Sequence, residues 1–358
     1  MSIEFAEFRA GDRLPRQREL FENAFPEHLG TQTASVEHYQ WKFHGLPWHP
    51  QSYEYEAAED GQMLGYYAAL PYRYEIAGCA MIAGMVCDVM THSQARGRGV
   101  FTELGRFALA EMQATELAFV TGYPIRPEVM GGHLRVGWQV AFQLPMYIKP
   151  LRANAILKSK RLGWLAPLAN AGIVAQRATL TRLPVAKEYT SSGGSPDELL
   201  GSAEFAALVA GWAASVPNHL AKSAEFYQWR LGAPGTSYRV FLTYRGGEVV
   251  AAAIGREATL YGVPSFALLD LMVLHGHERA LASLYKDVER WALQRGAEAL
   301  VTMVSRFRAR QYRLARVGFL RSPYAFSLIV RSVSDSIATE SLVREADWHL
   351  MWIDSDDL

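Results

Sequence analysis

The stretch Met85–Gly105 restricts the fold of this chain more than any other part of the sequence. It begins with an apolar, β-branched run, Met85–Thr91, which is typical of a buried strand. A short polar turn, Gln94–Gly99, comes next. Apolar residues then recur with helical spacing at Val100, Phe101, Leu104, Phe107, Ala108 and Met112. The sequence therefore predicts a buried strand that a tight turn joins to the first turn of a helix.

The turn has the features of an anion site. Gly97 and Gly99 allow neighbouring backbone N–H groups to point inward, and the N-terminus of the helix adds partial positive charge. Arg96 and Arg98 add full charges. A turn of this kind suits a pyrophosphate.

Two phosphate-binding motifs do not match this turn. A Walker A loop needs a lysine and a hydroxyl residue after its second glycine, and neither is present. The dinucleotide fingerprint needs a third glycine soon after the second, but Gly105 comes too late. The run Gln94-Ala-Arg-Gly-Arg-Gly99 instead reads Gln/Arg-x-x-Gly-x-Gly/Ala. It resembles the pyrophosphate loop of the GNAT (GCN5-related) N-acetyltransferases, and an ordinary glycine-rich turn remains the alternative.

Composition narrows the function classes. The chain of 358 residues is long enough for two domains, and its net charge of zero creates no global field that would recruit nucleic acid or an anionic membrane. Cys79 and Cys87 are too few for a disulfide scaffold or a zinc site, so we expect a reducing cytoplasm. We expect neither a signal peptide nor a membrane-spanning helix, since no run of the required apolar length is present.

The second half of the chain repeats the first. Four matched pairs occur in the same order, namely His38–Phe43 with Phe226–Leu231, Asp60–Gly61 with Arg245–Gly247, Met85–Met90 with Leu268–Met272, and Arg135–Trp138 with Arg316–Phe319. This predicts a tandem duplication of one module. The loop itself is not repeated, because Leu274–Ala280 lacks Gly-x-Gly and its Glu278 would oppose a pyrophosphate. We therefore expect a second module that keeps the fold without the cofactor site, and cofactor binding in another manner remains the alternative.

Three domain ranges follow from this repeat. We predict a catalytic domain at 1–150, a helical connector with a Ser/Gly linker at 151–198, and a degenerate second domain with a C-terminal extension at 199–358. Ser191–Pro196 is typical of a flexible linker. Within the connector, Leu162–Leu180 predicts a packed helix, and a membrane-surface helix is the alternative.

The C-terminal segment combines two patterns. The apolar part of Asp347–Asp357 predicts an edge strand, and its acidic end predicts a solvated tail.

The resemblance implies an α/β (α+β) fold of two tandem GNAT-like modules, each a mixed, mostly antiparallel twisted sheet flanked by helices. Acetyl-CoA would lie between the strand that ends near Thr91 and the strand that ends near Thr121. The backbone near Val89 or Met90 would supply the oxyanion donor. The cofactor-binding residues implied are Val89, Met90, Thr91, Gln94, Ala95, Arg96, Gly97, Arg98, Gly99, Val100 and Phe101. No metal is expected.

The catalytic candidates are less well defined. Many family members carry a tyrosine at the position of His133, and a histidine there can donate or relay a proton to the departing thiolate; a surface histidine is the alternative. Asp88 and Glu128 are candidates for the base, although Asp88 has a counterpart, Asp270, in the second module, which favours a structural role. Tyr123 is a candidate for contact with the acceptor.

These observations predict an acetyl-CoA-dependent N-acyltransferase that acts on a small-molecule primary amine. No nucleic-acid partner is expected, and a homodimer stays open. One alternative is a transferase that takes its acyl group from an acyl-carrier protein or an aminoacyl-tRNA, with Arg96, Arg98 and Arg106 as a basic patch for the carrier protein. The other is a non-catalytic acyl-CoA-binding protein.

Overall fold

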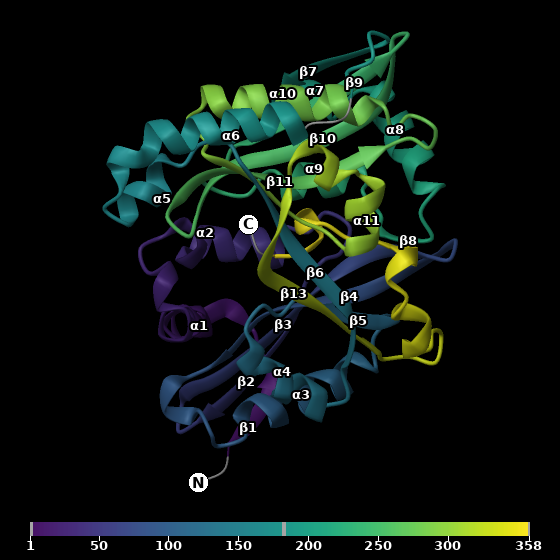
Figure 1. The fold of residues 1–358 in the computed structure, drawn as a ribbon. Helices are drawn as coiled ribbons and strands as arrows, with labels where there is room; N and C mark the ends of the chain where they lie inside the picture. Colours follow the sequence, from purple (N-terminus) through teal and green to yellow (C-terminus); the bar gives the residue numbers. More distant parts are fainter. Residues whose placement is uncertain (1–2, 181–183, 357–358) are drawn as a thin grey trace. The chain divides into compact units, whose positions relative to one another are not determined.

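The computed structural model describes residues 3–180 and 184–356, without the side chains of residues 177–180. Figure 1 shows the elements of the chain in sequence colours. Contacts divide the chain into two compact units that do not follow the chain in simple order. Unit 1 contains Met1–Phe142, Gln228–Gly235 and Ser327–Arg344, and unit 2 contains Gln143–Tyr227, Thr236–Phe326 and Glu345–Leu358. Each predicted domain is one continuous range of the sequence, whereas each of these units combines three separate segments.

Unit 1 is built on a mixed sheet. Its antiparallel part runs through β1 (Glu4–Glu7), β2 (Tyr53–Glu59), β3 (Gln62–Ile76) and β4 (Cys79–Thr91). β5 (Phe119–Gly122) then pairs with β4 in parallel. The end of β13 (Leu320–Ser332) pairs with β5 antiparallel, from Ile329 to Ser332. A strand from the far end of the sequence therefore completes the sheet of this unit.

The α-helices of unit 1 include α1 (Ala10–Ala24), α2 (Val36–Tyr39), α3 (Val100–Met112) and α4 (Pro127–Arg135). The predicted apolar face of α3 is confirmed, because Val100, Leu104 and Met112 are buried in the core of the unit. Gly65 of β3 permits this close approach, since a Cβ there would lie 2.9 Å from the Val100 side chain.

The two copies of the repeated aromatic motif meet within unit 1. The indole N–H of Trp41 donates to the carbonyl of Trp229 at 2.8 Å, and the indole N–H of Trp229 donates to the carbonyl of Trp41 at 2.9 Å. The two rings stack with their centroids 5.1 Å apart. The two matched tryptophans therefore make the same bond to each other's backbone.

Unit 2 repeats the same strand pattern. β9 (Tyr238–Arg245), β10 (Glu248–Leu260) and β11 (Val263–Val273) are antiparallel neighbours, and β12 (Ala299–Met303) pairs with β11 in parallel. The end of β6 (Gln139–Pro150) pairs antiparallel with β12, as β13 does with β5 in unit 1. The other elements of the chain are α5 (Asn154–Ser159), α6 (Ala166–Leu180), β7 (Tyr189–Gly194), α7 (Pro196–Leu199), α8 (Ala203–Ala213), β8 (Asn218–Leu220), α9 (Ala224–Arg230), α10 (Ala280–Gln294), α11 (Arg306–Gln311) and β14 (Trp348–His349).

The prediction of a flexible linker at Ser191–Pro196 is wrong. Residues Tyr189–Gly194 form β7, which pairs along its whole length with β9. Ser191 and Thr243 share a hydroxyl hydrogen bond of 2.8 Å across this pair. Gly193 is required by packing, because a Cβ there would come within 2.9 Å of the Phe241 ring. The Ser/Gly composition therefore reflects an edge strand lying on an aromatic side chain.

The connector forms helices, as predicted, but several of its apolar side chains are exposed. Trp164 is 76% and Leu168 73% exposed. In the part of the chain that the structure describes, no helix is both long and apolar enough to cross a membrane.

Two adjacent glycines of α4 give a matched test of packing against α3. We expect Gly131→Ala to raise the free energy of unfolding by up to about 1 kcal/mol, since the helical position is open. Gly132→Ala should lower it by about 1–3 kcal/mol, because its Cβ would overlap the Phe101 ring. Denaturant titration of both variants provides the measurement. Equal effects at the two positions would contradict the packing described here.

Candidate functional site

The loop between β4 and α3 has the backbone geometry that its glycines predict. After a single 3-10 turn at Ser93–Ala95, Gly97 and Gly99 adopt left-handed φ angles of 81° and 83°. Side chains rarely tolerate this conformation, so glycine is needed at both positions. No atom lies within 4 Å of an ideal Cβ built at either glycine, so the space in front of the loop is open.

Some backbone N–H groups of the loop are bonded within the turn, and others have no acceptor in the described part of the chain. The N–H groups of Ala95, Arg96 and Arg98 bond to carbonyl groups within the turn itself. Among the described residues, no acceptor bonds to the N–H groups of Gly97, Gly99, Val100 and Phe101. The turn predicted to suit a pyrophosphate therefore offers these four donors at the positive end of α3, the arrangement that binds phosphate groups.

The charged side chains of the loop are not equivalent. Arg98 is paired with Glu59, whose two carboxylate oxygens both lie 2.9 Å from the same guanidinium nitrogen. Arg96 and Gln94 are exposed. Arg96 is therefore the side chain of this loop that can turn toward an incoming anion without first breaking an ion pair.

The strands beside the loop separate where the resemblance places the cofactor. The parallel pairing of β4 with β5 ends at Val86 and Gly122, whereas β4 continues to Thr91. β4 also bulges here, since the register with β3 jumps between Cys87 and Met90 and leaves Asp88 and Val89 without matched partners. β4 therefore runs beyond its pairing with β5 from Cys87 to Thr91.

Two buried hydroxyl groups lie at different positions along these strands, since Thr121 pairs opposite Met85 and Thr91 ends β4. The hydroxyl oxygens of Thr91 and Thr121, near the ends of β4 and β5, are buried, and no hydrogen-bond partner for either lies within the described residues. Buried hydroxyl groups are normally bonded, so the missing partners at these two positions are unusual. Thr91 is among the cofactor-binding residues that the resemblance implies, whereas Thr121 is not.

Asp88 lies in the bulge with a left-handed φ of 46°. Its carboxylate accepts a bond from the Lys42 ammonium at 2.9 Å. Lys42 was not identified from the sequence, although it lies inside the repeated aromatic motif. In unit 2 the counterpart Asp270 is also paired with a lysine, Lys222, at 2.6 Å. A charged pair at both positions supports a structural role for these aspartates.

His133 is buried on α4, between two aromatic rings. Its ring centroid lies 5.0 Å from that of Phe101 and 5.5 Å from that of Trp138. Its Nδ1 is buried, and no partner for it lies within the described part of the chain. Burial lowers the pKa of His133 to about 4. The imidazole is therefore neutral at pH 7, and it is not the surface histidine that stood as the alternative.

This shift predicts a dependence of stability on pH. A histidine whose folded pKa lies below its unfolded value costs stability as pH falls through the unfolded value of about 6.5. We expect the protein to lose about 3 kcal/mol from His133 between pH 6.5 and 4. Chemical denaturation across this range should show a smaller loss for His133→Phe. Parallel curves for the two proteins would contradict the assigned burial.

The remaining candidates occupy different surroundings. Tyr123, directly after β5, is buried. Glu128 on α4 is exposed, whereas Arg126 is paired with Glu27. No hydrogen bond or ion pair joins Asp88 to His133 within the described residues.

In the corresponding loop of unit 2, Leu274–Ala280, the side chain of Glu278 bonds to the loop backbone. Gly276 has a left-handed φ of 84°, but its N–H donates to the Glu278 carboxylate at 3.1 Å. The Glu278 carboxylate therefore accepts the backbone N–H that a phosphate would need. This agrees with the expectation that the negative charge of Glu278 would oppose a pyrophosphate.

Comparison with known proteins gives a consistent result. Residues 11–141 match the model of the acetyltransferase (GNAT) domain. No match to the chain was found among curated proteins. Solved structures of similar fold include a GCN5-related N-acetyltransferase from Anabaena variabilis (TM-score 0.66, 11% identity, covering 93% of this chain and 73% of that one). A second is a conserved protein of unknown function from Enterococcus faecalis, described as a probable N-acyltransferase (TM-score 0.61, 13% identity, covering 93% of this chain and 73% of that one). A third is a GCN5-related N-acetyltransferase from Kribbella flavida (TM-score 0.59, 12% identity, covering 92% of this chain and 71% of that one). The mixed sheet flanked by helices is the fold of these proteins, and residues 11–141 are similar to the GNAT acetyltransferase domain.

Proposed function

We propose that this protein is an N-acyltransferase that transfers the acetyl group of acetyl-CoA to a primary amine of a small molecule. The observation that carries this proposal is the row of unbonded N–H groups where α3 begins, next to two strands that separate. A pyrophosphate needs such donors, and a thioester needs a strip of open strand backbone beside it.

The residues of unit 1 suit this co-substrate. Gly97, Gly99, Val100 and Phe101 would bond to the pyrophosphate through their N–H groups. The backbone at Val89 would stabilise the negative charge that develops on the thioester oxygen. The acceptor nitrogen attacks the carbonyl carbon, the carbon–sulfur bond breaks, and the proton lost by the amine ends on the departing thiolate.

The catalytic side chains have distinct proposed parts. His133 is neutral at pH 7, so it acts as a hydrogen-bond donor or proton relay and not as a charged acid. Asp88, held by Lys42, positions the bulge of β4. Tyr123 would contact the acceptor from the end of β5.

Unit 2 fits the history that we propose for the chain. A tandem duplication explains the matched motifs, the reciprocal bonds of Trp41 and Trp229, and the repeated strand pattern. The bond between the Gly276 N–H and the Glu278 carboxylate supports the proposal that the second copy does not bind the cofactor. No disulfide joins Cys79 and Cys87 among the described residues, which supports a reducing cytoplasm as part of this proposal.

Thiol release from acetyl-CoA by the full chain, measured with a panel of amino sugars, amino acids and polyamines, tests this function. We expect release to depend on one class of amine, with an acetylated product visible by mass spectrometry. Binding of acetyl-CoA without amine-dependent release would favour the non-catalytic acyl-CoA-binding protein. Product formed only from an acylated carrier protein or an aminoacyl-tRNA would favour the other alternative.

A further inference from the structure

A pocket of about 390 Å³ lies in unit 2, away from the loop that corresponds to the cofactor loop of unit 1. It lies beside α11 and the 3-10 helix Leu314–Val317, with contributions from β6 and β13. By the repeat, Leu314 stands where unit 1 has His133. The pocket is lined by Tyr147, Arg306, Ala309, Arg310, Arg313, Leu314, Ala315, Arg316 and Arg321.

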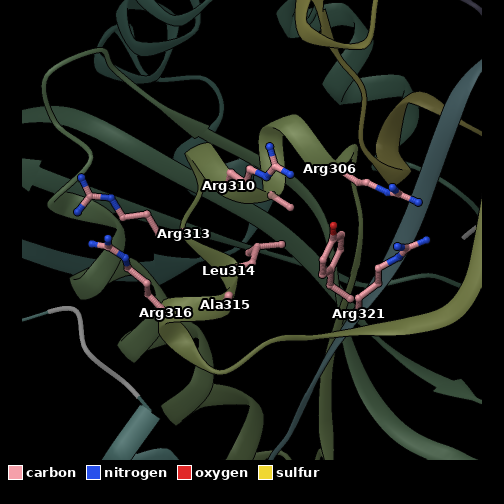
Figure 2. Close-up of a pocket in the computed structure, with 9 residues that line it drawn as sticks. Arg306, Arg310, Arg313, Leu314, Ala315, Arg316 and Arg321 are labelled. Atoms are coloured by element: carbon pink, nitrogen blue, oxygen red, sulfur yellow. The ribbon is translucent and has the colours of Figure 1, made fainter.

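The arginines of this pocket surround an apolar floor. Figure 2 shows Arg306 and Arg321 extending to one side and Arg313 and Arg316 to the other, with Arg310 above Leu314 between the two pairs. None of the five forms an ion pair with a carboxylate of the described residues.

One carboxylate, that of Glu345, also acts on Tyr147. Burial raises the pKa of the Tyr147 hydroxyl and the Glu345 charge adds to this, while the charges of Arg321, Arg306 and Arg310 lower it. The Glu345 carboxylate accepts the backbone N–H of Phe307 at 2.8 Å. The five arginines therefore give the pocket an excess of positive charge. Because these cations repel one another, an anionic ligand would reduce the repulsion.

The backbone at Arg313 adds an independent observation. Arg313 has a left-handed φ of 55°, a conformation that costs free energy in any residue with a Cβ. A glycine would adopt it without this cost. Backbone strain at a ligand-facing residue is a common feature of binding sites.

We propose that this pocket binds a polyphosphorylated small molecule of nucleotide size. Guanidinium groups pair with phosphate oxygens in bidentate fashion, and arginines on two sides can hold more than one phosphate. The organic part of the ligand covers the Tyr147 ring and Leu314. The volume lies within the range of small-molecule sites.

The test uses ATP and inorganic pyrophosphate as probes in equilibrium titrations of the full chain. All variants carry Gly97→Glu with Gly99→Glu, so that the cofactor loop of unit 1 does not contribute. We expect saturable ATP binding in this background and at least a tenfold weaker affinity after Arg306→Ala with Arg310→Ala. Arg279→Ala, at an exposed arginine of unit 2 outside the pocket, is the matched control and should bind ATP normally.

A second variant separates binding from folding. Arg313→Gly should weaken ATP binding at least tenfold while the melting temperature stays equal or rises, because the strain is relieved. Tyr147→Ala should weaken binding of ATP and leave that of pyrophosphate unchanged.

Three outcomes would overturn the proposal. The first is no ATP binding in the background variant, and the second is binding that survives the arginine substitutions. The third is RNA or an acidic protein binding more tightly than ATP through the same arginines. Equal affinities for pyrophosphate and ATP would overturn the assignment of an organic part to the ligand.

Discussion

Replacing Gly97 and Gly99 together by glutamate is expected to weaken acetyl-CoA binding at least 100-fold. Both glycines have φ angles that a side chain adopts only at a cost of about 1–3 kcal/mol each, so the substitutions distort the cradle. The two new carboxylates would also face the pyrophosphate in the open space before α3. Calorimetric titration of wild type and variant gives the comparison.

Two controls separate the causes of this loss. Gly78→Glu introduces the same side chain at a φ of 82°, also in open space, but in the turn between β3 and β4. It should lower stability and leave binding intact. Gly97→Ala with Gly99→Ala introduces the strain without the charge, so its affinity should fall between wild type and the glutamate variant. A glutamate variant that is folded and binds acetyl-CoA normally would refute the assignment of the loop.

The cofactor loop could be predicted from sequence because its determinants are local. A strand, two glycines and an amphipathic helix lie within one short stretch, and each needs only its neighbours to be interpreted. The bulge at Asp88 and the unbonded hydroxyl of Thr121 depend on strand register, which no local pattern specifies. The loop was therefore predictable, and much of the surrounding site was not.

Contacts between distant segments explain the predictions that failed. Ser191–Gly194 has the composition of a linker, but β9 offers it an edge to pair with. The acidic C-terminus suggested a solvated tail, yet Asp354 is fully buried. The partners that order these segments are β9 for β7 and Lys222 for Asp354. Both lie far away in the sequence, and the composition of a segment carries no information about such a partner.

Lys222→Met is expected to lower the free energy of unfolding by about 3–5 kcal/mol at pH 7. The Lys222 ammonium is fully buried, 2.6 Å from Asp270 and 3.4 Å from Asp354. Tyr227 donates a further bond of 2.8 Å to Asp270. Methionine keeps most of the side-chain volume but removes the charge, so two buried carboxylates lose their counterion.

This loss should depend on pH with a definite sign. Burial raises the pKa of Asp354 to about 6, even though Lys222 acts to lower it. An acid whose folded pKa exceeds its unfolded value stabilises the fold at low pH and ceases to do so as pH rises through the folded pKa. Without the lysine this pKa rises further, so the difference from wild type should shrink as pH falls from 7 to 5. Lys222 also lowers the pKa of His349, and its removal acts in the same direction.

Matched variants distinguish charge from packing at this site. Lys42→Met removes the corresponding lysine of unit 1, where the side chains of Lys42 and Asp88 are 8% and 12% exposed, and should cost less. Adding Asp354→Asn to Lys222→Met should restore part of the stability at pH 7, because one buried charge disappears. A deficit of the same size at pH 5 and pH 7 would mean that Lys222 contributes through packing alone. A deficit that shrinks at pH 5 would establish that Asp270 and Asp354 require a buried cation, a requirement that keeps Lys222 in place without any catalytic role.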